Sequence, residues 1–208
     1  MIDVIEELLK ADIESLKNPK RVAELIRLNG LHYDPHIKHL YDKKDLVNLI
    51  NDGMIQIPEQ LAEALVWLSD KSITQYVEVG TFNGKSTVFI SAYLSRFNPV
   101  FRTLTIDNSR NFENPYKSLT IASIKGTSDD VAGLKSDLCL IDGDHSFAWI
   151  KRDYENLGKN AKYCMFHDIL ETEIIQGMPM DVKSFWNSIK RPSSVEFTYG
   201  GRMGIGIL

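Results

Sequence analysis

Hydrophobic residues recur at helical spacing over roughly the first 70 residues and then gather into short apolar runs. The first expected helix ends at Asn18-Pro19 and is marked by apolar residues three or four positions apart, namely Ile2, Ile5, Leu8, Leu9, Ile13 and Leu16. Further helices are predicted over residues 22–28, 45–51 and 58–70. Residues 31–39 are predicted to form a polar, aromatic loop that either crosses the surface or closes over a substrate. We therefore expect residues 1–72 to form a helical cap or dimerisation segment, through which two copies would form a homodimer.

From residue 75 onward, short strands alternate with amphipathic helices. Strands are predicted over 75–79, 101–106, 118–125, 138–141 and 163–166, and helices run from residue 85 towards 93, over 146–160 and over 182–189. Two closing strands, 194–198 and 203–207, are joined by a glycine-containing turn and predict a hairpin. This order predicts an α/β fold in which residues 73–208 form one compact unit. Its core would be a Rossmann-like, seven-stranded, mostly parallel sheet with an antiparallel C-terminal hairpin.

The first strand leads through two glycines into a helix, and this stretch organises the rest of the chain. Gly80 and Gly84 allow the backbone to approach a ligand closely, and the helix start offers free N–H groups. A P-loop would need four residues between the glycines before Lys85, whereas this chain has three. Glu78 at the strand end would repel phosphates and suits a nucleoside carrying a cationic sulfonium. A P-loop-like NTPase and a purely structural turn remain the alternatives.

The amino-acid composition limits the kinds of partner that the protein is expected to bind. The 208 residues are 25% charged and 43% hydrophobic with a net charge of −4, which is ordinary for a globular domain and predicts no nucleic-acid partner. No apolar run approaches ~20 residues, and acidic residues stand where a secretory signal would be basic, so no membrane partner is expected. Cys139 and Cys164 fall in apolar strands and are interpreted as core thiols in a reducing compartment. The sequence therefore predicts a cytoplasmic protein.

Polar residues follow each later strand. Asp107 ends the second strand, where nucleoside-binding folds place a carboxylate on the ribose, although it would also serve as a turn cap. Ser128 and Asp129 follow the third strand, either as a helix cap or against an adenine edge. The fourth strand ends in Asp142, which also resembles a Walker B acid and so supports the NTPase alternative.

Two neighbouring strands end in an acid and a histidine. Asp142 and His145 follow the fourth strand, and His167-Asp168 follows the fifth. Because the carboxyl ends of parallel strands meet at one edge, these four side chains are expected to lie together. Carboxylate oxygens with imidazole predict a divalent-cation site at Asp142, His167 and Asp168. In the alternative interpretation, His167 orients Asp168 or packs in the sheet.

These pieces together resemble a known family. Residues from about 75 to 208 are similar to class I S-adenosylmethionine-dependent methyltransferases, and more narrowly to the macrocin O-methyltransferase and cephalosporin-hydroxylase-like group of small-molecule enzymes. The resemblance rests on the stretch from Glu78 to Ser86, the Asp142-Gly143-Asp144-His145-Ser146 segment and His167-Asp168-Ile169, together with the helix at 182–189 and the closing Gly204-Ile205-Gly206.

The resemblance implies transfer of a methyl group from S-adenosylmethionine to a small hydroxylated acceptor. It implies a cofactor site at Glu78, Gly80, Thr81, Phe82, Gly84, Ser86, Asp107, Ser128, Asp129 and Asp142. Metal-dependent relatives hold magnesium at the position of Asp142 and after the fifth strand, where this chain has His167-Asp168 in place of Asp-Asn. His145 or His167 would then take the acceptor proton, His145 being favoured. A non-methylating binding protein or an oxygenase on the same fold remains a further alternative.

Overall fold

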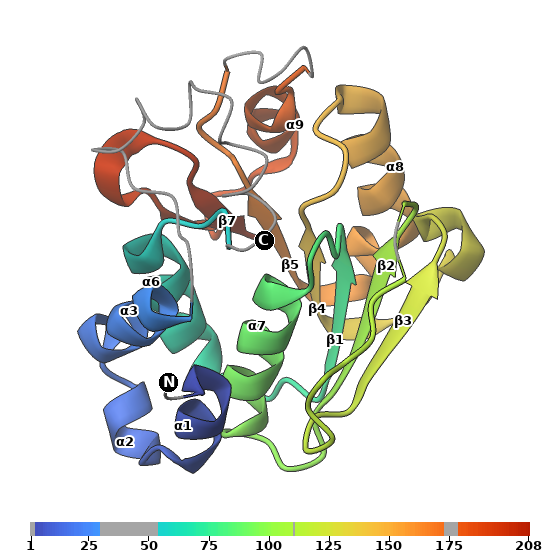
Figure 1. The fold of residues 1–208 in the computed structure, drawn as a ribbon. Coiled ribbons are helices and arrows are strands. Elements are labelled where there is room, and N and C mark those ends of the chain that lie inside the picture. The colour runs from blue at the N-terminus through green and yellow to red at the C-terminus, as the bar shows by residue number, and fades with distance from the viewer. Residues whose placement is uncertain (1–2, 30–53, 110, 173–178) are drawn as a thin grey trace, which may run out of the picture.

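The computed structural model describes residues 3–29, 54–109, 111–172 and 179–208. The predicted loop over 31–39 and the predicted helix over 45–51 lie outside the described residues. Figure 1 shows the described elements as a central sheet with helices on both of its faces.

The N-terminal segment is helical, as predicted, but its first helix is divided. Helix α1 (Val4–Lys10) ends at Ala11, whose ψ of 150° is extended, and α2 (Ile13–Leu16) begins after Asp12. The Asp12 carboxylate accepts a hydrogen bond from the backbone N–H of Ser15 at 3.0 Å and so caps a new helix. The prediction of one continuous helix was therefore wrong. The next two helices, α3 (Pro19–Leu28) and α6 (Pro58–Ser69), are confirmed.

Seven strands form one sheet in the order β3-β2-β1-β4-β5-β7-β6, which confirms the predicted fold. The strands are β1 (Gln75–Val79), β2 (Arg102–Asp107), β3 (Ile121–Lys125), β4 (Ser136–Ile141), β5 (Ala161–His167), β6 (Val195–Phe197) and β7 (Ile205–Ile207). The first five pair in parallel, and β7 runs antiparallel to both β5 and β6. The strand order reverses between β1 and β4, so a crevice for a ligand is expected at their carboxyl ends.

The connections depart from prediction in three places. The expected helix over 146–160 is divided into α8 (Phe147–Asn156) and the 3-10 turn η3 (Gly158–Asn160), and the third strand begins at Ile121 instead of residue 118. The 3-10 helix η2 (Ser128–Val131) is capped by Thr127 through a reciprocal pair of hydrogen bonds with Asp130, so the cap expected at Ser128 or Asp129 was wrong. Helices α7 (Lys85–Ser95) and α9 (Val182–Ile189) confirm their predictions, and η4 (Tyr199–Gly201) forms the hairpin turn.

Along each strand, side chains point alternately to the two faces of the sheet, and this divides the hydrophobic core into two clusters. Tyr76 faces a cluster that contains residues of α1, α3, α6 and α7, whereas Val77 faces a cluster that contains residues of α8 and α9. The N-terminal helices thus share a core with one face of the sheet (Figure 1). Cys139 and Cys164 are neighbours on β4 and β5, buried and free, which confirms the prediction of core thiols. Among the described residues, no helix has the length and apolarity needed to cross a bilayer.

Candidate active site

The glycine turn after β1 is packed directly against the residue that follows β4. Gly80 has a φ of +97°, and its N–H donates to the carbonyl of Ile106 at 2.9 Å. A Cβ at this position would lie 2.1 Å from the carbonyl oxygen of Asp142. The close approach therefore requires glycine, and it places the predicted cofactor turn beside the predicted metal ligand.

Two predicted cofactor residues are bonded to each other. The N–H of Phe82 donates to Oδ2 of Asp107 at 2.9 Å, and Oδ1 of Asp107 accepts from the N–H and hydroxyl of Ser109. Phe82 has a φ of +50°, a strained conformation for a residue with a Cβ. The hydroxyls of Thr81 and Thr105 lie 2.5 Å apart and join the same turn to β2. The turn is thus held in shape from β2.

Helix α7 begins at the far side of this turn. Gly84, its N-cap, has a φ of +76°, and a Cβ there would lie 2.0 Å from the ring of Phe112. Oδ1 of Asn83 accepts from the N–H of Lys85 at 3.0 Å. Ser86 lies half-buried in the first helical turn, where backbone N–H groups and the helix dipole favour an anionic group.

Glu78 is a buried acid inside β1. Its side chain is 1% exposed, and its Oε2 has no hydrogen-bond partner among the described residues. Burial raises the pKa of Glu78 to about 8. A buried carboxyl with an unsatisfied oxygen suits a cationic ligand group, because a nearby positive charge would favour its ionised form.

The two residues expected to flank adenine are bonded to α8. Ser128 is fully buried and donates to Oδ1 of Asp153 at 2.6 Å, and Asn156 donates to the Ser128 hydroxyl. Asp129 forms an ion pair with Arg152 and accepts from Asn156. These contacts give both residues a part in holding η2 against α8. Their proposed role toward adenine stays a prediction.

The acids and histidines at the ends of β4 and β5 do lie together. Nδ1 of His167 lies 3.2 Å from Oδ1 of Asp142 and 3.2 Å from Oδ2 of Asp168. Nε2 of His145 lies 3.1 Å from Oδ2 of Asp168 and 3.7 Å from Oδ1 of Asp142. Asp168 has a φ of +62°, so it shares with Phe82 a backbone conformation that is strained for a non-glycine residue. The cluster therefore interleaves two carboxylates with two imidazoles.

Charge complementarity sets the pKa values in this cluster. Burial alone would raise the pKa of Asp142 and of Asp168, but the charge of His167 and hydrogen bonds from the histidines lower both. Burial would likewise lower the pKa of His145, yet the hydrogen bonds and charges of the two acids raise it to about 10. The same acids raise the pKa of His167 well above its ordinary value. The contacts therefore favour the ionised form of both carboxylates and the protonated form of both imidazoles.

The donor set fits a divalent cation. One ligand atom from each of Asp142, His145 and Asp168 lies within 4.8 Å of the others. Oδ1 of Asp168 and Nε2 of His167 are buried and lack hydrogen-bond partners among the described residues. Hard cations such as Mg²⁺ prefer carboxylate oxygens of this kind. The compact group contains His145, whereas the sequence predicted His167 with the two acids; His167 instead contacts both carboxylates through Nδ1.

One residue of this site was missed from sequence. Nε2 of Gln56 donates to Oδ2 of Asp142 at 3.2 Å, and Gln56 is 4% exposed. The two residues lie 86 positions apart, and a glutamine before a helix carries no motif that would reveal the contact.

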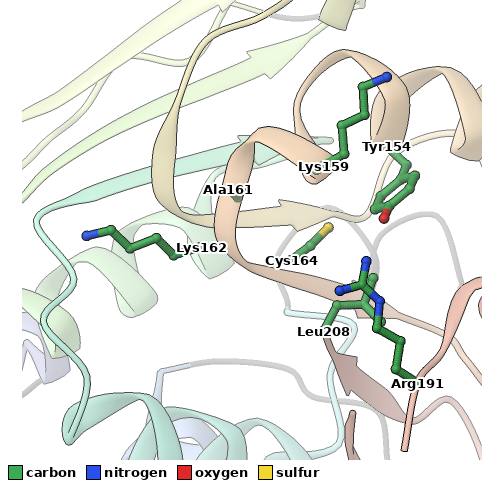
Figure 2. Close-up of a pocket in the computed structure, with 8 residues that line it drawn as sticks. Tyr154, Lys159, Ala161, Lys162, Cys164, Arg191 and Leu208 are labelled. Atoms are coloured by element: carbon green, nitrogen blue, oxygen red, sulfur yellow. The ribbon is translucent and has the colours of Figure 1, made fainter. Parts of the chain in front are cut away.

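A separate pocket lies at the opposite edge of the sheet and contains none of the predicted site residues. Figure 2 shows Tyr154, Lys159, Cys164 and Arg191 around it, near the start of β5. Lys159 is paired with Glu155, and Lys162 is paired with Asp137. Two of its three cationic side chains thus already have acidic partners.

Comparisons with known proteins agree with this geometry. Residues 77–169, from β1 to just past β5, match the family model described as a methyltransferase domain. A sequence comparison with curated proteins found no match. The fold is similar to that of the O-methyltransferase TomG from Streptomyces achromogenes, with 14% identity, 84% and 89% of the two chains covered and a TM-score of 0.51.

Two further structures show the same likeness. Cofactor-bound Rv0187 from MTB has 16% identity, covers 91% of this chain and 96% of its own, and gives a TM-score of 0.52. A protein from Staphylococcus aureus assigned as a caffeoyl-CoA O-methyltransferase has 17% identity, 91% and 98% coverage and a TM-score of 0.52. Residues 77–169 therefore match a methyltransferase domain, and the described residues share the fold of these three structures.

Proposed function

We propose that the protein transfers the methyl group of S-adenosylmethionine to a hydroxyl oxygen of a small molecule, with a divalent cation held at the ends of β4 and β5. The observation that carries this proposal is that the carboxylates of Asp142 and Asp168 lie together beside the glycine turn, with His145 next to both. The likeness to O-methyltransferases such as TomG supports the fold on which such a reaction runs.

The glycine turn and the acids around it would bind the methyl donor. S-adenosylmethionine supplies a methyl group on a positively charged sulfonium. Glu78 offers a buried carboxyl to that positive charge, and the turn held by Asp107 offers a shape that a side chain at Gly80 would block. Ser86 and the N–H groups at the start of α7 would receive the carboxylate of the methionine part.

Asp142 and Asp168 would hold the cation through their carboxylates, with Mg²⁺ the proposed ion. When bound, the cation would act as a Lewis acid that lowers the pKa of the acceptor hydroxyl. His167 is 3% exposed and would orient the carboxylates of Asp142 and Asp168 through the contacts of its Nδ1.

His145 would take the proton from the acceptor hydroxyl. Its side chain is 22% exposed, compared with 3% for His167, so His145 is the more accessible of the two imidazoles. The pKa of His145 is raised by the same carboxylates that would bind the cation, so neutralising them would return the imidazole towards its neutral form.

The reaction balances with these groups alone. The hydroxyl proton passes to Nε2 of His145 as an oxygen lone pair forms the new C–O bond. The S–CH₃ bond breaks, and its electron pair stays on sulfur to give neutral S-adenosylhomocysteine. In-line displacement of this kind depends mostly on alignment, which the rigid ends of β1, β4 and β5 would provide.

A transfer assay with isotopically labelled S-adenosylmethionine tests the proposal. A panel of catechols, sugars and polyketide alcohols would be offered with Mg²⁺, with EDTA, and with the Asp142→Asn variant. We expect label in a hydroxylated product with Mg²⁺, and a loss of at least about a hundredfold with EDTA or Asp142→Asn.

Asp144→Asn is the matched control, because Asp144 is an exposed acid of the same loop whose hydrogen bond among the described residues is from the N–H of Ser146. Full turnover in Asp142→Asn would contradict the proposed cation site. The oxygenase alternative would be favoured if the protein binds a cofactor, transfers no methyl group to any panel member and consumes molecular oxygen.

A further inference from the structure

The N-terminal helical segment reaches the predicted cation site through one buried side chain. Gln56 stands just before α6, and its Nε2 donates to Oδ2 of Asp142 at 3.2 Å. Its 4% exposure shows that the polar amide is held inside the protein. A buried amide normally has a specific hydrogen-bond partner, and here that partner is a carboxylate of the site.

The two oxygens of Asp142 are thereby given different surroundings. Oδ2 accepts from Gln56, whereas Oδ1 lies 3.2 Å from Nδ1 of His167 and 3.7 Å from Nε2 of His145. Oδ1 also contacts His167, but it is the oxygen on the side of His145, and so the one that a cation in the cluster would meet. By holding Oδ2, the Gln56 amide fixes the rotation of the Asp142 carboxylate and so keeps its two oxygens in different surroundings.

The backbone that carries Gln56 is braced against the other half of the site. Ile57 is buried against Met203, and one turn later Gln60 accepts from the N–H of Gly204 and donates to the carbonyls of Tyr199 and Arg202. The same turn accepts hydrogen bonds from the residues that follow Asp168, since the N–H groups of residues 169 and 170 donate to it. The start of α6 is thus connected to both acids.

We propose that Gln56 is a positioning residue that presents Asp142 to the cation through one oxygen, and so favours Mg²⁺ and Mn²⁺ over Ca²⁺. This inference rests on the proposed cation site. Mg²⁺ requires compact octahedral coordination, whereas Ca²⁺ accepts more oxygens and readily takes both oxygens of one carboxylate. Freeing Oδ2 of Asp142 from the amide would allow the two-oxygen mode and shift the preference towards Ca²⁺.

Calorimetric titration of the purified protein with Mn²⁺ and, separately, with Ca²⁺ tests this inference without any turnover. Gln56→Met keeps the side-chain length and removes the donor. We expect about tenfold weaker Mn²⁺ binding and a clearly smaller ratio of Mn²⁺ to Ca²⁺ affinity. S-adenosylmethionine affinity and the melting temperature should change little. The control is Gln75→Met, the same substitution at an exposed glutamine of β1.

Equal Mn²⁺ affinity and an equal ratio in Gln56→Met and the wild type would overturn the inference while leaving the cation site in place. Absence of Mn²⁺ binding in the wild type would overturn the inference together with the cation part of the proposed function. S-adenosylmethionine binding in that same sample would show that the methyltransferase part still stands. If Gln56→Met does not fold, Gln56→Asn, whose shorter side chain withdraws the amide from Asp142, provides the same comparison.

Discussion

Nε2 of His145 lies 3.1 Å from Oδ2 of Asp168, and this contact joins the loop after β4 to the end of β5. His167 makes a similar contact with the same oxygen from the buried side. The two histidines therefore flank one acid from different directions. Replacing His145 and replacing His167 are therefore expected to have different effects on turnover and on cation binding.

Replacing the two histidines separately distinguishes proton transfer from orientation. His145→Gln should lower kcat by roughly 10²–10⁴-fold, because the proton acceptor is lost, with Mn²⁺ affinity changed only a few-fold. His167→Gln should weaken Mn²⁺ binding by about 10–100-fold, because both carboxylates lose their shared partner. Steady-state kinetics and Mn²⁺ titration of both variants measure this. If both variants lost kcat and Mn²⁺ affinity to the same extent, the different roles given to the two histidines would be wrong.

Glu78 should make cofactor affinity depend on pH. Its pKa is raised to about 8 in the cofactor-free protein, mainly by burial, so the carboxyl is mostly neutral at pH 7. A cationic ligand favours the ionised form, and binding therefore releases a proton. Affinity for S-adenosylmethionine should rise with pH up to about 8, by at most about tenfold per pH unit, and then level off.

Glu78→Gln provides the control for this pH dependence, because the ionisations of the ligand itself are unchanged in that variant. Titrations at pH values below and above 8 should show a steeper rise for the wild type than for Glu78→Gln. Parallel pH profiles for the two proteins would show that Glu78 does not respond to the charge of the ligand.

A methyl group at Gly80 should block the site. Its Cβ would meet the Asp142 carbonyl at 2.1 Å, and a φ of +97° is strained for any other residue. Gly133→Ala is the matched control, since Gly133 has a φ of +83° and, apart from its chain neighbours, no described residue lies within 4 Å of the added Cβ. Both variants should lose about 1–3 kcal/mol from backbone strain, whereas Gly80→Ala should also lose cofactor binding. Calorimetry on the folded variants would decide, and retained binding in Gly80→Ala would contradict the site geometry.

The fold was predictable because its signals are local. Apolar runs of strand length, a glycine turn and amphipathic helices appear directly in the sequence, and parallel connections leave few topologies. The break between α1 and α2 was missed because Ala11-Asp12 contains neither proline nor glycine. There, a side-chain cap at Asp12 decided the structure against a helical pattern that continued to Leu16.

The candidate site was predictable only where strand ends bring residues together. The acids and histidines after β4 and β5 meet because parallel strands end at one edge of the sheet. Gln56 and the bond between Ser128 and Asp153 depend on tertiary packing, which no local pattern encodes. Such contacts between residues far apart in the chain are the part of the site that the sequence did not predict.

Asp153 should make folding stability fall as pH rises. Its pKa is raised from 3.8 to about 6 by burial, although the hydrogen bond from Ser128 opposes the shift. The folded state therefore binds the proton more tightly, and the free energy of unfolding should decrease between pH 4 and pH 6 by roughly 2 kcal/mol. Asp153→Asn keeps an oxygen for the Ser128 hydroxyl and removes this titration.

Urea denaturation at pH 4.5 and pH 7.5 measures the effect. Asp153→Asn should gain stability relative to the wild type between these two pH values, by about 2 kcal/mol. A stability difference that is the same at both pH values would show that Asp153 does not titrate in this range.

Calorimetric titration of the wild-type protein with S-adenosylmethionine and with ATP, each with and without Mg²⁺, tests the assignment of a methyltransferase most directly. S-adenosylmethionine should bind with a Kd on the order of micromolar, and ATP should not bind. Binding of ATP with Mg²⁺ in place of S-adenosylmethionine would contradict a methyl-donor site at the turn between Gly80 and Gly84.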